Sequence, residues 1–286
     1  MKKILVTGAN GQLGQCLQKI SSQFEEFEFI FTDSETLDIT NKEEVNDFFW
    51  QNAPDFCINA AAYTAVDLAE TDIEKAFLVN ADGTENLAEA CAENNAQFIH
   101  VSTDYVFDGE NNLAYTEEDF TNPLGVYGAS KLAGDELALE VNPCSVILRT
   151  SWVYSEFGKN FVKTMLNLFA TKEELSIVAD QFGQPTNAND LAEAIMKIIK
   201  SEKITPGIFN FSNLGRISWF DFAEKIAELS DAKIKLNAIE TSQYPTPAKR
   251  PKNSVLDLDK ISKTYAIQLK PWEESLEDCI QILQNN

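Results

Sequence analysis

Histidine is nearly absent from this chain of 286 residues, in which His100 is the only one. A histidine-rich zinc site is therefore excluded, as is a catalytic arrangement that needs two histidines. His100 lies inside the apolar run 98–101, so we expect a buried strand residue rather than a catalyst.

Basic side chains are also scarce. Lysine and arginine together number 23, against 45 aspartate and glutamate residues, which gives a formal net charge of −22. Nucleic acids and anionic membranes both require a basic face, so this composition argues against either as a partner. An anionic ligand can still bind where a few donors cluster locally.

Neither the cysteines nor the apolar runs indicate export or membrane insertion. The five cysteines contain no C-x-x-C pair and lie far apart, at Cys16, Cys57, Cys91, Cys144 and Cys279. We expect reduced thiols, mostly buried, in a cytoplasmic protein. The first apolar run stops at Gly8, too early for a signal peptide, and no run approaches the length of a membrane span.

Three glycines near the N-terminus, Gly8, Gly11 and Gly14, give the first positive indication. They follow the apolar residues 4–6 and precede a run with helical apolar spacing, which predicts a strand, a tight turn and a helix. Glycine permits the turn at Gly8, lets a diphosphate approach the backbone at Gly11, and lets the helix pack against the strand at Gly14. Because helix N-termini favour anions, the stretch predicts a dinucleotide site.

Apolar segments alternate with helical patterns through the first half of the chain. We expect strands at 4–6, 27–32, 54–62, 97–102 and 143–150, with helices at 41–52, 74–94 and from Tyr127 onward. This alternation predicts an α/β fold, a Rossmann-type doubly wound parallel sheet. Ligands bind such sheets beyond the carboxyl ends of the strands, where the motifs discussed here all fall.

Elements become shorter and loops longer after Trp152. We expect helices at 161–170, 190–200 and 219–229, a short strand at 208–211, a polar loop at 180–189 and a long loop at 241–253. The chain therefore divides into a dinucleotide-binding domain, 1–151, and a smaller C-terminal part, 152–286. The second part is expected to be mainly a substrate-binding lobe, with some elements returning to the sheet.

Two acids follow the second predicted strand. Asp33 stands about 20 residues beyond the glycines, where an acid can bond the adenosine ribose hydroxyls and disfavour a 2′-phosphate, so it favours NADH. Asp38 is a rival for the adenosine end of a cofactor. The alternative is that either acid merely caps or solvates the loop.

Tyr127 and Lys131 have the spacing Y-x-x-x-K at the start of a helical pattern, so they share one helix face. A lysine ammonium beside a phenol favours the phenolate and is expected to lower the pKa of Tyr127 from about 10 toward neutrality. Such a tyrosine can give a proton to a carbonyl oxygen that is being reduced. Thr103, at the end of the preceding strand, can supply a second hydroxyl to that oxygen.

Together these motifs resemble the extended short-chain dehydrogenase/reductase family, over almost the full length. Within the family, the chain is most similar to reductases of dTDP-linked 4-keto sugars. The supporting segments are 8–14, 59–67, 102–109, 127–131, 149–154, 180–186 and 250–254. Related sugar-nucleotide dehydratases carry Thr-Asp-Glu where this chain has Thr103, Asp104 and Tyr105. The missing glutamate is the acid–base group that a dehydratase needs, which favours simple reduction.

The resemblance implies a role for each matching residue. Tyr127 is the implied proton donor. Lys131 is implied to adjust the pKa of Tyr127 and to bind the cofactor ribose, and Thr103 is implied to assist at the substrate oxygen. Implied cofactor contacts are Gly11, Gln12, Leu13, Asp38, Ile39, Ala60, Ala61 and Ala62, and implied substrate contacts are Thr103, Asp104 and Trp152. The cofactor is NADPH or NADH, and the substrate a dTDP-sugar. Some family members bind Mg²⁺ at a dimer interface, so the resemblance also makes a homodimer and a Mg²⁺ site possible for this chain.

Several alternatives remain open at this point. Trp152 can instead be a core residue, and Arg250, which suits bidentate phosphate binding, can instead form a surface ion pair. The chain can also be a reductase or epimerase of another nucleotide sugar. A third reading is a non-catalytic regulatory subunit, because the regulatory subunit of methionine adenosyltransferase resembles the same motif set; intact Tyr127, Lys131 and Thr103 argue against it.

Overall fold

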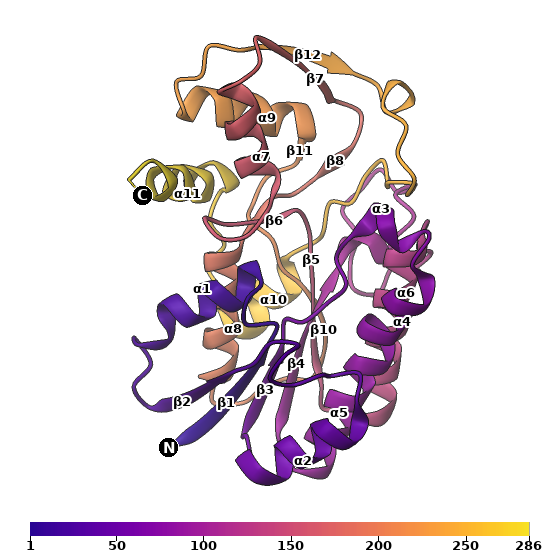
Figure 1. Ribbon diagram of the computed structural model, residues 1–286, viewed down its shortest axis with the longest axis vertical. Coiled ribbons are helices and arrows are strands. Elements are labelled where there is room, and N and C mark those ends of the chain that lie inside the picture. The colour runs from indigo at the N-terminus through magenta and orange to yellow at the C-terminus, as the bar shows by residue number, and fades with distance from the viewer. Residues whose placement is uncertain (286) are drawn as a thin grey trace.

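A six-stranded parallel sheet forms the centre of the molecule, in a computed structural model that describes residues 1–285 (Figure 1). The strand order is β10-β5-β4-β3-β1-β2, and neighbouring strands all run parallel. Their bounds are β1 Lys2–Thr7, β2 Phe27–Phe31, β3 Phe56–Asn59, β4 Gln97–Thr103, β5 Val146–Thr150 and β10 Gly207–Asn210. The chain adds β2 on one side of β1 and then crosses to β3 on the other, so the predicted doubly wound fold is confirmed.

Helices cover both faces of this sheet (Figure 1). On one face lie α1 (Gln12–Ser21), α8 (Ala188–Ile199) and α10 (Asp259–Tyr265); on the other lie α2 (Lys42–Asn52), α5 (Gly83–Glu93) and α6 (Val126–Val141). Successive residues of β1 serve opposite cores, because strand side chains alternate: Ile4 and Val6 pack toward α1, and Leu5 packs toward α2. This explains why buried parallel strands read as continuous apolar runs.

The helix predicted at 74–94 is not one uniform α-helix. It consists of α4 (Ile73–Phe77), the π-helical segment η1 (Leu78–Asp82) and α5, preceded by the short α3 (Val66–Ala69). The wider π turn places Asn80 between two neighbours: its side chain bonds the backbone of Tyr63 and the hydroxyl of Ser130 on α6. Such π turns are rare and often occur at functional sites.

The remaining elements build a smaller second core (Figure 1). Three two-stranded pairs occur here: β6 (Val153–Tyr154) with β9 (Thr186–Asn187), β8 (Phe182–Gly183) with β11 (Ile217–Ser218), and β7 (Glu174–Val178) with β12 (Lys235–Ile239). Helices α7 (Phe161–Phe169), α9 (Trp219–Leu229) and α11 (Trp272–Asn285) pack around them. The polar loop predicted at 180–189 is therefore wrong in part, and β7, β12, α10 and α11 were not predicted.

The division at residues 151 and 152 stays an interpretation, because the second segment also contributes to the first core. Strand β10 extends the central sheet beside β5, and α8 packs against α1. Short 3₁₀ turns, η2 (Asp104–Val106) and η3 (Thr241–Gln243), complete the chain within the described residues.

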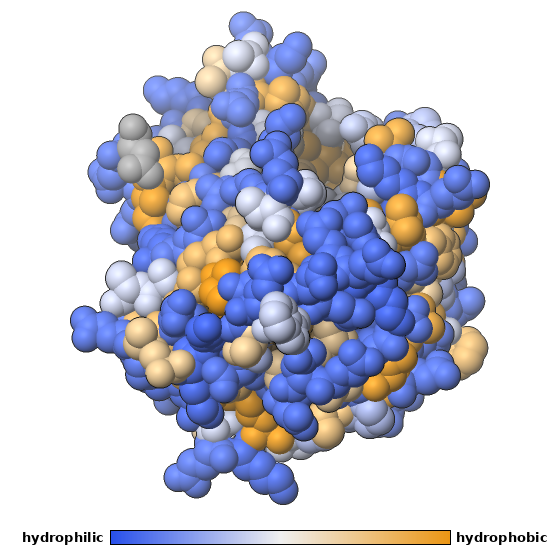
Figure 2. All heavy atoms as spheres, turned by 60° about the horizontal axis from the view of Figure 1, so that its bottom comes forward, coloured by the Kyte–Doolittle hydropathy of each residue, from blue (hydrophilic) through white to orange (hydrophobic). Residues whose placement is uncertain are grey.

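Surface properties agree with the composition. Figure 2 shows a face on which hydrophilic residues predominate and hydrophobic ones form scattered patches. Four of the five cysteines are buried and none forms a disulfide, as expected, while Cys144 is exposed. Within residues 1–285, none of the helices combines the length and the apolar character that crossing a membrane would take.

Candidate active site

A cavity of about 1120 Å³ opens beyond the carboxyl ends of the central strands. It brings together most of the residues that the sequence singled out. The predicted site residues in its lining are Gly8, Gly11, Gln12, Leu13, Asp33, Asp38, Ile39, Ala60, Ala61, Ala62, Thr103, Asp104, Tyr127, Lys131 and Trp152. Gly14 and Arg250 do not line it.

The glycine turn leaves no room for side chains at Gly8 and Gly14. Gly8 has φ +68°, and a Cβ there would lie 2.6 Å from the backbone nitrogen of Ala61. A Cβ on Gly14 would lie 2.4 Å from the Gly8 carbonyl oxygen, so Gly14 serves the packing of α1 against the turn rather than contact with a ligand. Gly11 precedes α1 and faces the cavity, where the free N–H groups of a helix N-terminus favour an anion.

The two candidate acids lie at the β2 end of this cavity. The Asp33 carboxylate accepts hydrogen bonds from Asn10 Nδ2, at 2.6 Å, and from the Thr36 hydroxyl, at 2.9 Å. The Thr36 hydroxyl, with the other donors, lowers the Asp33 pKa, so the group is charged at neutral pH. Asp38 accepts from the backbone and hydroxyl of Thr40, at 3.0 and 2.7 Å. Both acids cap their own loops and also face the cavity.

Tyr127 lies in the first turn of α6, whose N-terminus is held by Glu70: the Val126 amide donates to its carboxylate at 2.8 Å. The Tyr127 ring packs edge-on against Tyr105. Burial raises the pKa of Tyr127 to about 12, although the Thr103 hydroxyl opposes this shift. The phenol is therefore protonated at neutral pH.

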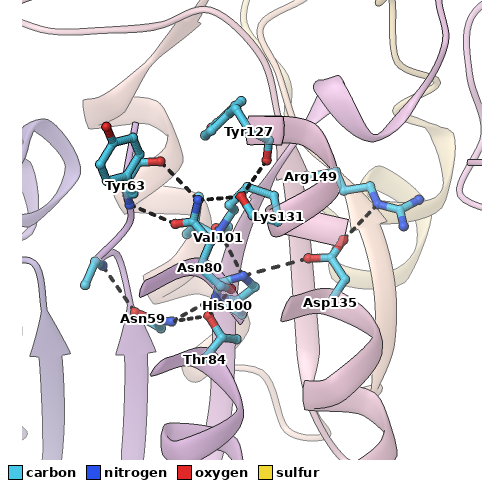
Figure 3. Close-up of polar contacts among 12 residues, drawn as sticks. Asn59, Tyr63, Asn80, Thr84, His100, Val101, Tyr127, Lys131, Asp135 and Arg149 are labelled. Carbon is cyan, nitrogen blue, oxygen red and sulfur yellow. Dashed lines mark hydrogen bonds and ion pairs between the residues drawn. The ribbon is translucent and has the colours of Figure 1, made fainter. Parts of the chain in front are cut away.

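The expectation that Lys131 lowers the Tyr127 pKa is wrong for this state of the protein. The buried Lys131 ammonium nitrogen points to Val101 and His100 instead: Nζ lies 2.8 Å from the Val101 carbonyl oxygen and 3.0 Å from His100 Nε2 (Figure 3). Desolvation by burial lowers the pKa of Lys131 to about 8. The spacing along α6 places both side chains on one face of the helix, but the direction of Lys131 Nζ depends on its partners on β4.

His100 is a buried residue of β4, as expected, but its contacts were missed. Its Nδ1 lies 3.0 Å from Asn59 Nδ2, and its Nε2 lies 3.8 Å from Asp135 Oδ1 on α6. Asn59 is directly opposite His100 in the register of β3 with β4. No local sequence pattern indicates this contact, because it depends on strand register.

Asp104 adds a buried carboxyl group beside Thr103. It is buried, and burial raises its pKa to about 6. The Thr103 hydroxyl donates to Asp104 Oδ1 at 3.1 Å, while Oδ2 has no hydrogen-bond partner in the protein. Both side chains are therefore placed to bond a ligand in the cavity.

Trp152 combines packing with cavity lining. Its backbone has φ +48°, and its ring stacks on Trp219 of α9 with centroids 3.5 Å apart and planes 9° apart. Trp219 in turn contacts Phe161 of α7. Trp219 and Phe161 also line the cavity, as does the exposed Lys159; the sequence analysis singled out none of the three.

Arg250 forms an ion pair with Asp67, which is the alternative to phosphate binding that the sequence left open. Its guanidinium donates to both carboxylate oxygens of Asp67, at 2.8 and 3.1 Å. A role for Arg250 in substrate binding stays a prediction.

No residue is assigned to Mg²⁺. Among residues 1–285, no group of three or more histidine, cysteine or acidic side chains is placed to hold a metal ion.

Comparison with known proteins gives one consistent family. The family described as "RmlD substrate binding domain" matches residues 1–285. A dTDP-4-dehydrorhamnose reductase of Aggregatibacter actinomycetemcomitans is 45% identical, over 97% of this chain and 98% of its own length.

Two solved structures carry the same name. That from Clostridium acetobutylicum has a TM-score of 0.94 and 43% identity, and covers 99% of both chains. That from Bacillus anthracis, a complex with NADP, has a TM-score of 0.95 and 39% identity, and covers 99% of this chain and 100% of its own. The family match, the sequence identities and the overall folds all agree, and the chain belongs to the dTDP-4-dehydrorhamnose reductase family.

Proposed function

We propose that this chain is an NAD(P)H-dependent oxidoreductase that reduces the C4 keto group of dTDP-4-dehydro-6-deoxy-L-mannose (dTDP-4-dehydro-β-L-rhamnose) to give dTDP-L-rhamnose. One observation carries the proposal: Tyr127, Thr103 and Lys131 line the same cavity as the glycine turn. A proton donor for a carbonyl oxygen and a site for a dinucleotide are therefore neighbours, which a carbonyl reduction requires.

The residues present fit a nicotinamide dinucleotide. Gly8 and Gly11 present bare backbone to the cavity, beside the small side chains of Ala60 and Ala61. The N-terminus of α1 would hold the diphosphate, and the small residues 60–62 would let a flat ring lie close. When bound, this cofactor supplies the hydride.

Tyr127 supplies the proton that the reduced carbonyl oxygen needs. Because its phenol is protonated at neutral pH, it can donate to an oxygen that gains charge as hydride arrives. The Thr103 hydroxyl would turn from Asp104 Oδ1, to which it donates in the absence of substrate, and donate a second hydrogen bond to the same oxygen. Lys131 would bond the cofactor ribose. Solvent then returns the proton to the phenolate, so each turnover consumes one hydride and one proton.

The sugar would lie against Asp104 and Trp152. Lys159 and Lys131 are the two basic residues in the cavity lining that the structure describes, and Lys159 is exposed. We assign Lys159 to the diphosphate of the sugar nucleotide, because a flexible ammonium suits phosphate as a point charge.

Oxidation of NADH and NADPH, followed at the absorption band of the reduced nicotinamide, tests the proposal with enzymatically made dTDP-4-dehydro-6-deoxy-L-mannose. Rapid oxidation with dTDP-L-rhamnose as product is the expected result. Oxidation only with another sugar nucleotide would move the assignment to that substrate. Cofactor binding with no oxidation for any sugar nucleotide, together with co-purification of a synthetase, would support the regulatory alternative.

Asp33→Asn is expected to raise kcat/KM with NADPH relative to NADH by about tenfold. The charged carboxylate repels a 2′-phosphate, and a tenfold change corresponds to about 1.4 kcal/mol of this repulsion. Steady-state kinetics with both cofactors measure the ratio, and Asp38→Asn tests the rival acid, which lines the same cavity. An unchanged ratio in Asp33→Asn would remove Asp33 from cofactor selection.

A further inference from the structure

The contact between His100 and Lys131 raises the question of which of the two nitrogens carries the proton between them. His100 Nε2 and Lys131 Nζ lie 3.0 Å apart, and both side chains are almost wholly buried (Figure 3). Lys131 Nζ also donates to the Val101 carbonyl oxygen at 2.8 Å. One proton lies between the two nitrogens, and the nitrogen that carries it determines the charge of Lys131.

Asn59 fixes the orientation of the system. The Ala61 amide donates to Asn59 Oδ1 at 3.2 Å, so that oxygen faces Ala61. The Thr84 hydroxyl donates to the Asn80 carbonyl at 2.8 Å, so it must accept from Asn59 Nδ2, at 3.3 Å. These two contacts leave the Asn59 NH₂ group facing His100 Nδ1, at 3.0 Å.

The histidine tautomer follows from this orientation. His100 Nδ1 accepts a hydrogen bond, so the single ring proton of the neutral imidazole is on Nε2. That N–H points at Lys131 Nζ, which can accept only as a neutral amine. Burial lowers the His100 pKa far below its usual range, so an imidazolium is not the alternative.

We propose that His100 is a positioning residue whose Nε2–H donates to a neutral Lys131 amine in the cofactor-free enzyme at mildly alkaline pH, and that cofactor binding there brings a solvent proton onto Lys131. This inference rests on the proposed function, in which Lys131 bonds the cofactor ribose as an ammonium. It adds His100 to the residues of the site, and it couples cofactor binding to the uptake of one proton.

Asp135 provides the second acceptor that the proposal needs. Its Oδ1 is buried without a hydrogen-bond partner, 3.8 Å from His100 Nε2, while Oδ2 accepts from Arg149 Nε at 3.3 Å. Once Lys131 is an ammonium, it no longer accepts a hydrogen bond. The His100 N–H then turns to Asp135 Oδ1 and is not left unpaired.

Other ionisable groups surround this cluster. They are Tyr127 and Asp135 on α6, Asp104 on η2, and Arg149 on β5. Arg149 and Asp135 pair with each other, and burial raises the pKa of Tyr127 to about 12 and that of Asp104 to about 6. Burial lowers the pKa of Lys131 to about 8, so Lys131 is the group of this cluster whose charge changes in the mildly alkaline range.

The tautomer can be read directly, because His100 is the only histidine. In cofactor-free protein labelled with ¹⁵N-histidine, the long-range ¹H–¹⁵N spectrum is expected to show a protonated Nε2 and an unprotonated Nδ1, unchanged between about pH 6 and pH 9. A protonated Nδ1 would overturn the proposal, because Nε2 would then accept from a Lys131 ammonium.

Proton uptake on cofactor binding tests the second statement of the proposal, that Lys131 gains a proton when the cofactor binds. At about pH 9, NADPH titrations by calorimetry in buffers of different ionisation enthalpy are expected to show uptake approaching one proton per site. His100→Gln is expected to lose at least half of this uptake, because a glutamine oxygen can accept from an ammonium that is charged before binding. Lys131→Arg, which keeps its charge, is the matched control and is expected to show none.

Equal uptake in the wild type and in His100→Gln, or no uptake in the wild type, would contradict the proposal. The tautomer measurement uses the unaltered protein, so it stands even where a variant fails to fold. Neither experiment involves turnover. A wrong tautomer in an enzyme that reduces the dTDP-sugar would reject this inference and leave the proposed function intact.

Discussion

Tyr127→Phe is expected to lower kcat for the reduction by about 10²–10⁴-fold, the usual contribution of a general acid. The substitution removes one hydroxyl from a half-buried ring whose packing against Tyr105 it preserves. The cofactor site lies along the backbone of the glycine turn, so the Kd for NADPH should change by less than about threefold. Single-turnover kinetics and cofactor titration measure the two quantities separately.

Tyr154→Phe is the matched control for this prediction. Its hydroxyl is buried in the second core and has no hydrogen-bond partner in the protein, so its removal should leave kcat unchanged. Retention of kcat in Tyr127→Phe would reject the proton-donor role of Tyr127, while loss of activity in both variants would point to damaged packing instead.

Gly14→Ala is expected to lower the free energy of unfolding by about 3 kcal/mol, the upper part of the range for overpacked sites. The added Cβ would lie 2.4 Å from the Gly8 carbonyl oxygen and 2.6 Å from the Ala9 Cα, and both are backbone atoms that cannot rotate away. α1 must therefore move off the turn. Urea unfolding followed by circular dichroism measures the change.

Gly11→Ala separates packing from ligand binding at the same turn. A Cβ there would meet the Gly8 oxygen at 3.2 Å, a contact that a small shift relieves, so stability should stay within about 1 kcal/mol of the wild type. Gly11 lines the cavity at the N-terminus of α1, where the proposed diphosphate would approach its backbone, so NADPH should bind at least tenfold more weakly to the variant. Equal losses of stability in both variants would contradict this division of roles between Gly11 and Gly14.

The local motifs could be predicted from the sequence because their chemistry depends on residues close together in the chain. A strand, a glycine turn and a helix follow from residues 4–20, and the spacing of Tyr127 and Lys131 places both on one face of α6. Strands that alternate with helices have few ways to pack, so the parallel sheet and the cavity at its carboxyl edge followed as well.

The second core was predicted less completely, since its strands are short and pair over long separations. β7 and β12 lie about 60 residues apart in the chain and pair only with each other. The stacking of Trp152 on Trp219 joins two segments in the same way, so the sequence could name Trp152 but not its partner.

The sequence by itself determined the fold class and the glycine turn and singled out the candidate reacting side chains, because period and spacing are local properties of the chain. The tertiary structure alone decided their protonation. Burial raises the pKa of Tyr127, strand register places Asn59 beside His100, and the packing of α6 on β4 places Lys131 beside His100. Charge in a buried site depends on desolvation and on hydrogen-bond partners from other elements, which no single segment of the chain encodes.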